Sequence, residues 1–309
     1  MHFSTGTRAG FLAWARFAAV ALAMLATSVV AQTLYATTVR RYVGPSELGG
    51  ALYVVDPKTA KAKLVGPLRI PGLRSVGVTG LAVHPRTKVL YGITAGLTPE
   101  LRPSLITIDP RTAEAKLVGP LGSAGTDINF DAKGNLLVWF ADSNELGKID
   151  LATGAATSIG PSGLAGAGGG LAIDRKGTVY VAPNTAAGTL DIVDTRTGAG
   201  TPGPTLTGAP YLSEINSLTF SPEGELFAVN SNLAAPAKTA LVIINTGTGV
   251  VSIVGDLPDD ADGLTFSTDA SASGAKPPAF AWIWAAIAIV GVLVFAALAV
   301  RRLRRAHER

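Results

Sequence analysis

The sequence predicts an all-β protein, a five-bladed β-propeller, and three observations lead to this prediction. Residues 52–68 and 105–121 are near-copies, identical at twelve of seventeen positions. Self-similarity at a period of roughly 50 residues is typical of repeat folds. Four kinds of apolar strand then recur in a fixed order up to residue 267. The 36 glycines and 19 prolines fit the many turns that such a fold requires.

The four kinds of strand can be followed along the chain by their residue patterns. The first kind, which we expect to be innermost, occurs at 80–85, 127–131, 170–174, 217–222 and 263–267. The second kind follows it at 90–94, 136–140, 179–183 and 226–230. The third kind ends in an Asp or Asn, and the fourth is a run resembling LVG that is faint around Thr201.

The two ends of this repeat region predict how the ring closes. The last inner strand, 263–267, has no second strand after it, whereas a second strand without an inner partner stands at 34–38. If these two strands pair, each kind occurs five times and a blade takes about 47 residues, which suits four short strands with turns. Closure of this kind also removes open sheet edges.

The turns after the third strands support the same register. An Asp or Asn begins each turn and can accept hydrogen bonds from turn amides, and a small residue closes it in the left-handed region. The closing residues are Gly154, Gly198 and Gly249 in three turns and Ala60 and Ala113 in the other two. We interpret the four acids as turn residues rather than catalytic groups. The opening residues are Asp56, Asp109, Asp150, Asp194 and, as an amide, Asn245.

The repeat pattern over residues 34–267 resembles that of bacterial secreted β-propellers of the NHL and YVTN type. It combines GLAxxP, LYxxx and LxxIDxxTGxxxxVG in this order. The resemblance implies the propeller fold and export from the cytoplasm. It implies no particular activity, because such blades serve enzymes, ligand binders and scaffolds alike.

Residues 1–31 read as a secretory signal peptide. Arg8 and Arg16 precede an apolar run from 17 to 30, and small residues end at Ala31, before a cleavage at Gln32. An uncleaved anchor helix is the alternative, although the run is short for a membrane span.

The C-terminal part predicts a single transmembrane helix. Residues 279–300 carry no charge and are long enough to cross a hydrocarbon core of about 30 Å. The basic tail 301–309 favours the cytoplasmic side, and 268–278 reads as a flexible tether. We therefore expect a single-pass type I membrane protein with its propeller, 32–267, on the extracytoplasmic side, either periplasmic or at the cell surface. A sorting signal that is cut off on export is the alternative.

The charge distribution argues against a nucleic-acid partner. The formal net charge is +4, but 1–31 and 301–309 hold seven of the 26 basic residues and one of the 22 acidic ones. The body between them therefore has 19 basic and 21 acidic side chains and is slightly acidic, which removes the main support for binding a polyanion.

Candidate functional residues cluster where loops are expected to surround the central channel. Acids, amides and hydroxyls there could hold a polar ligand or a hard cation such as Ca²⁺ or Mg²⁺, although the same side chains could simply satisfy strand ends. The ligand-binding candidates are Thr79, Asp127, Asp142, Asn184, Asn216, Asn230 and Asp262.

Groups for the standard catalytic mechanisms are scarce. The chain has no cysteine, His84 is the only histidine between 32 and 267, and no G-x-S-x-G motif occurs. The acidic stretch 256–263 lacks the twelve-residue pattern of a calcium loop and predicts a solvated turn. The sequence thus favours a binding or scaffold module for a protein, glycan or small polar ligand. The alternatives are a metal-assisted propeller hydrolase or lyase with its site at the channel mouth, and a purely structural envelope protein.

Overall fold

The computed structural model describes residues 32–39, 42–44, 47–73, 75–96, 101–185, 188–211, 214–232 and 234–267, without side-chain detail for 42–48. The predicted signal peptide, tether, transmembrane helix and basic tail lie outside these residues. Among the described residues, no helix has the length and apolar character needed to cross a membrane.

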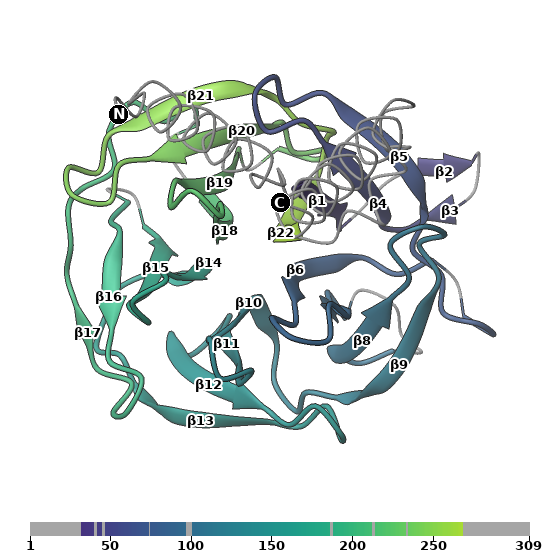
Figure 1. The fold of residues 1–309 in the computed structure, drawn as a ribbon, viewed down its shortest axis with the longest axis horizontal. Helices are drawn as coiled ribbons and strands as arrows, with labels where there is room; N and C mark the ends of the chain where they lie inside the picture. The colour runs from purple at the N-terminus through teal and green to yellow at the C-terminus, as the bar shows by residue number, and fades with distance from the viewer. Residues whose placement is uncertain are drawn as a thin grey trace, which may run out of the picture. The chain divides into compact units, whose positions relative to one another are not determined.

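The described residues form a five-bladed β-propeller, as the strand pattern predicts. Each blade is a four-stranded antiparallel sheet, and the five sheets surround a common centre (Figure 1). Blade 1 contains β22 (Ala261–Ser267), β1 (Thr33–Thr38), β4 (Ala51–Val55) and β5 (Ala62–Pro67). Blade 2 contains β6 (Val78–Val83), β7 (Leu90–Thr94), β8 (Ser104–Ile108) and β9 (Ala115–Pro120).

The other three blades follow in sequence order. Blade 3 contains β10 (Gly125–Phe130), β11 (Leu136–Phe140), β12 (Glu145–Ile149) and β13 (Ala156–Pro161). Blade 4 contains β14 (Ala167–Ile173), β15 (Val179–Asn184), β16 (Asp191–Val193) and the two-residue β17 (Gly200–Thr201), which is the faint strand of the sequence. Blade 5 contains β18 (Glu214–Phe220), β19 (Leu226–Ser231), β20 (Thr239–Ile244) and β21 (Val251–Asp256).

One element was not expected. A small two-stranded sheet, β2 (Tyr42–Gly44) with β3 (Glu47–Leu48), is inserted between the second and third strands of blade 1. It has no counterpart in the other blades, so the repeat pattern could not predict it.

The ring closes by the predicted pairing of the two ends of the propeller. β1 pairs with β22 in register from Thr33 opposite Ser267 to Thr38 opposite Ala261, and with β4 on its other side. Every residue of β1 is buried. The inner strands β6, β10, β14, β18 and β22 contact one another in turn around the centre.

Antiparallel pairing gives the propeller two distinct faces. The face that we call the turn face carries the turns between first and second strands, the turns between third and fourth strands, and both Gln32 and Ser267. The opposite face, called the mouth face, carries the starts of the inner strands and the ends of the second strands. The chain therefore enters and leaves the propeller on the turn face.

The turns that begin with Asp or Asn have the predicted geometry. The Oδ1 atoms of Asp56, Asp109, Asp150, Asp194 and Asn245 each accept a hydrogen bond from the backbone N–H two residues later, at 2.7–3.0 Å. The closing residues have positive φ, including Ala60 at 57° and Ala113 at 62°. These acids are thus turn residues, as the sequence indicates.

The core is distributed over the spaces between neighbouring blades. One cluster joins Tyr35 and Leu52 of blade 1 to Leu81 and Ile106 of blade 2, and further clusters fill the following junctions. Without disulfides, this apolar burial is the main force that stabilises the ring.

Candidate functional site

Asp127 lies at the centre of the ring, in β10. Its Oδ1 atom accepts a hydrogen bond from the backbone N–H of Ile128, and its Oδ2 atom accepts two more, from Leu171 in β14 and Leu218 in β18, all at 2.9 Å. The residue is fully buried. One side chain therefore ties together the inner strands of blades 3, 4 and 5.

The equivalent position on the other inner strands explains why an acid fits here. It is Gly80, Gly170, Ser217 or Gly263, each too small to fill the centre. A Cβ atom on Gly80 would lie only 2.8 Å from the Cα of Asp127. Ser217 also takes part in these contacts: its Oγ accepts the N–H of Leu264 at 3.0 Å, and its side chain hydrogen-bonds the carboxyl group of Asp127. Asp127 thus fills the axis below the channel mouth.

Burial raises the pKa of Asp127 well above its ordinary value, and the three backbone N–H donors oppose that rise. The backbone N–H groups and the side chain of Ser217 all hydrogen-bond this carboxyl group, so Asp127 joins the inner strands of the ring. Its ligand-binding role stays a prediction.

Asp262 presents a different environment at the start of β22. It is partly exposed, and no hydrogen bond to its carboxylate from another described residue is found. Burial is the main cause that raises its pKa well above the ordinary value, and the negative charges of Asp127, Glu214 and Asp260 add to the rise. Within the described residues, this carboxyl group therefore has no hydrogen-bond donor from the protein.

A small polar network lies beside it. The Oγ of Ser231 donates to Oε2 of Glu214 and to Oδ1 of Asn216, both at 3.1 Å, and Asn216 Nδ2 donates to the carbonyl of Ala261 at 3.5 Å. Because Ala261 precedes Asp262, this network connects β18 and β19 to the start of β22. Asn216 and Asp262, both predicted from the sequence, therefore lie near each other in the fold.

The remaining predicted residues are spread around the mouth face. Thr79 donates to the carbonyl of Gly125 at 3.1 Å, and the side chain of Asn184 accepts the N–H of Ile215 at 3.1 Å. Asn230 is buried. Its side chain accepts the N–H of Tyr211 and donates to the carbonyl groups of Tyr211 and Glu214. These three side chains join chain segments, which agrees with the alternative that they satisfy backbone groups. Asp142 lies exposed in the turn after β11.

Sequence reasoning missed Glu214 and Asp260. Glu214 was missed because β18 begins three residues earlier than its pattern indicates, and a bulge between Ile215 and Ser217 shifts the alternation of side chains. Asp260 lies in the acidic stretch, where a turn was predicted without a contact to the site.

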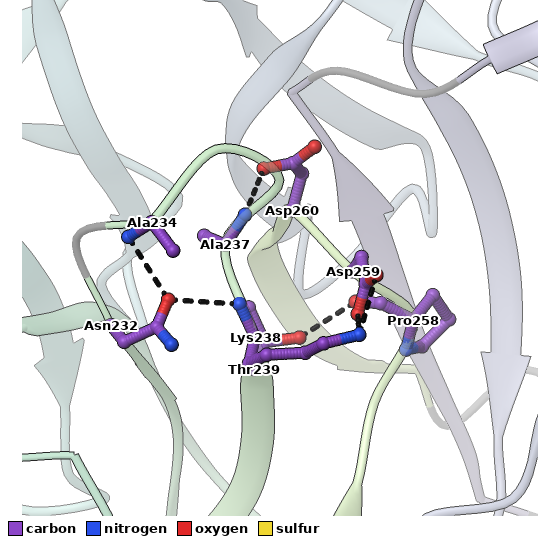
Figure 2. Close-up of polar contacts among 8 residues, drawn as sticks. All are labelled: Asn232, Ala234, Ala237, Lys238, Thr239, Pro258, Asp259 and Asp260. Carbon is purple, nitrogen blue, oxygen red and sulfur yellow. Dashed lines mark hydrogen bonds and ion pairs between the residues drawn. The ribbon is translucent and has the colours of Figure 1, made fainter.

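The acidic stretch 256–263 is an ordered turn that supports the neighbouring loop (Figure 2). Asp260, at φ 57°, accepts the N–H of Ala237 at 2.8 Å, and Asp259 forms an ion pair with Lys238 at 2.9 Å. The hydroxyl of Thr239 donates to the carbonyl of Pro258 at 2.6 Å. These contacts fix the backbone immediately before Asp262.

Metal ligation and histidine chemistry find little support in these positions. In the part of the chain that the structure describes, no group of three or more His, Asp or Glu side chains is placed to hold a metal ion. His84 is buried in the turn after β6, where its Nδ1 accepts the N–H groups of Arg86 and Thr87 at 3.2 Å. Its ring therefore accepts turn N–H groups, as an Asp or Ser side chain does in the turn between the first and second strands of other blades.

Comparisons with known proteins support the fold. No protein-family model matches the chain, and no curated protein matches it in sequence. Among solved structures, a chain of a nidogen/laminin complex is similar with a TM-score of 0.51 and 11% identity, covering 77% of this chain and 100% of the other. TolB from Acinetobacter baumannii is also similar, with a TM-score of 0.47 and 18% identity, covering 74% of this chain and 54% of the other. A protein of unknown function from Bacteroides caccae has a TM-score of 0.47 and 13% identity, covering 76% of this chain and 99% of the other. At these identities the likeness concerns the fold alone.

Proposed function

We propose that this protein is a binding module held at the outer face of a membrane, whose channel mouth receives a polar ligand that carries hydrogen-bond donors or positive charge. The proposal combines the predicted C-terminal helix with the geometry of the propeller. The predicted anchor follows Ser267, which ends β22 on the turn face, so the mouth face is formed by other loops than those next to the tether.

The observation that supports this function best is the environment of Asp262. A carboxyl group that is partly buried, repelled by neighbouring acids and without a protein donor is costly for the folded state. A ligand that donates N–H or O–H groups, or brings a cationic group, would offset that cost. Asn216, Glu214 and Ser231 offer further acceptors and donors beside it.

The same geometry favours binding over metal-assisted hydrolysis or lyase chemistry. Such an enzyme would need Asp127 and Asp262 to face one cavity and share a cation. Instead, the oxygens of Asp127 accept three backbone N–H groups, and its negative charge repels that of Asp262, as those of Glu214 and Asp260 do. The exposed apolar side chain of Leu64, on the outer strand of blade 1, also suits a module that contacts other molecules.

Thermal unfolding of the full-length protein in detergent tests this proposal. Spermidine, simple sugars, CaCl₂, MgCl₂ and EDTA would be compared as additives, since a ligand that binds only the folded state raises the melting temperature by mass action. We expect a rise with an amine or polyol that is lost in Asp262→Asn and retained in Asp259→Asn, an acid of the same turn outside the mouth. A rise that survives Asp262→Asn, or no rise with any additive, would contradict a polar-ligand site at this mouth.

A further inference from the structure

A groove of about 780 Å³ lies on the turn face where the ring closes, between blades 5 and 1. Its apolar side chains come from several strands and include Phe227 of β19, Ile253 of β21 and Phe266 of β22. The rings of Phe227 and Phe266 meet edge to face at 5.3 Å between centroids. The groove therefore has a firm apolar floor, formed where the two ends of the propeller meet.

Ile253 is the most exposed large apolar side chain of the described residues, at 58%. It lies on β21, the last strand of blade 5, whose sheet continues on one side only, towards β20. Ile253 lines the groove together with Ile243 of β20 and Phe227 of β19, so the groove crosses the face of the blade 5 sheet. The exposed side chain of Ile253 thus adds to the apolar floor formed by Phe227 and Phe266.

The charges at the rim indicate what such an occupant carries. Glu223 and Glu225, both exposed, line one side in the turn between β18 and β19, and Lys58 lines the other side in the turn after β4. Within the described residues Glu225 takes part in no ion pair. The side next to blade 5 is therefore acidic and complements a basic group.

We propose that this groove binds an extended peptide segment of a partner protein, with apolar side chains on the Phe227–Phe266 floor and a Lys or Arg beside Glu223 and Glu225. This surface is separate from the channel mouth, because it lies on the turn face, so it does not depend on the ligand proposed for the mouth.

The test uses a library of random ten-residue peptides displayed on phage and selected against the full-length protein in detergent. We expect the selected sequences to combine alternating apolar residues with Lys or Arg. Synthetic versions should lose at least tenfold in affinity for Ile253→Arg and severalfold for Glu225→Lys. Leu117→Arg is the matched control, because Leu117 is the third residue of its outer strand, as Ile253 is, is 48% exposed and does not line the groove.

Three results would overturn the proposal. One is selection of acidic peptides, or of none. Another is binding that Ile253→Arg leaves unchanged while the melting temperature shows an intact fold. The last is a change of oligomeric state in Ile253→Arg by light scattering, which would mean that a second copy of this chain occupies the groove.

Discussion

Asp127 in β10 accepts a hydrogen bond from the backbone N–H of Leu218 in β18, at 2.9 Å and across 91 residues of sequence. The same Oδ2 atom also accepts the N–H of Leu171 in β14. The contacts of this carboxyl group therefore form only when three blades have assembled. Local turn contacts such as that of Asp56 need a single hairpin.

Replacing Asp127 by Ala should destabilise the ring strongly. The variant leaves the N–H groups of Ile128, Leu171 and Leu218 buried without their acceptor, and a buried unsatisfied donor costs about 1–3 kcal/mol. With partial relaxation at the axis, we expect a total loss of about 3 kcal/mol or more in the free energy of unfolding. Urea denaturation followed by tryptophan fluorescence measures it.

The matched control is Asp142→Ala, which removes an exposed acid from the turn after β11 and should change stability by less than about 0.5 kcal/mol. Equal losses in the two variants would show that the contacts of Asp127 at the axis do not stabilise the ring.

Asp262→Asn should stabilise the protein at neutral pH. In the folded state, burial and the charges of Asp127, Glu214 and Asp260 raise the pKa of Asp262, so its stabilising contribution is complete below the ordinary Asp value, near pH 4. That contribution is lost as the pH rises towards the raised pKa, because the folded state must then hold a charged carboxylate. The variant removes this loss, and its melting temperature at pH 7 should exceed that of the unmodified protein by a few degrees.

Melting temperatures measured from pH 4 to pH 8 check the sign. The difference between Asp262→Asn and the unmodified protein should grow with pH and become small near pH 4. A difference that is constant over this range, or largest at low pH, would contradict a raised pKa at this site. Asp259→Asn, whose ion pair with Lys238 is exposed, serves as the control and should show little change.

The sequence predicts the contacts that are local and repeated, and it misses those that join distant blades. The Asp or Asn that opens a turn and the small residue that closes it are four positions apart and recur in every blade, so a pattern shows them. The pairing of β1 with β22 is also accessible, because one strand kind lacks a partner at each end. The propeller fold itself follows from these two facts.

The roles of individual site residues depend on contacts that no pattern displays. Asp127 and Asp262 look alike as acids at the starts of inner strands, yet one is held by three backbone donors and the other by none among the described residues. That difference arises from a one-residue offset. Asp127 occupies the position of Gly263, whereas Asp262 precedes it. A bulge at the start of β18 similarly places Glu214 near the mouth, where alternation alone would not place it.

Ala60→Gly should change stability by no more than a few tenths of a kcal/mol. Ala60 has a φ of 57°, and a left-handed conformation costs a residue with a Cβ about 1 kcal/mol. Its methyl group is buried, however, and burying one methyl contributes about 0.8 kcal/mol. The two effects nearly cancel, and thermal or urea unfolding should show it. Ala113→Gly, at the equivalent position of blade 2, should behave alike.

Gly198→Ala provides the contrast in blade 4. Gly198 has a φ of 80°, and a Cβ there would lie 2.3 Å from the carbonyl oxygen of Gly160 in the neighbouring blade. This substitution should therefore cost more than about 1 kcal/mol, because backbone atoms must move to accept it. If Ala60→Gly lowers stability as much as Gly198→Ala does, packing of the Ala60 methyl outweighs the conformational cost.

Leu34→Ala should weaken the ring at its closure. Leu34 is fully buried in β1 and packs in one cluster with Val55 and Leu264, which come from the two strands that flank it. Large-to-small changes of this kind cost about 2–5 kcal/mol. Leu64→Ala, on the outer strand of the same blade, removes a side chain that is 46% exposed and should cost far less.

Hydrogen exchange distinguishes opening of the ring at its closure from a uniform loss of stability in all blades. In Leu34→Ala, the amides of β22 should lose protection before those of β10 in the blade across the ring. Uniform loss of protection in β22 and β10 would mean that the closure does not open before the rest of the propeller.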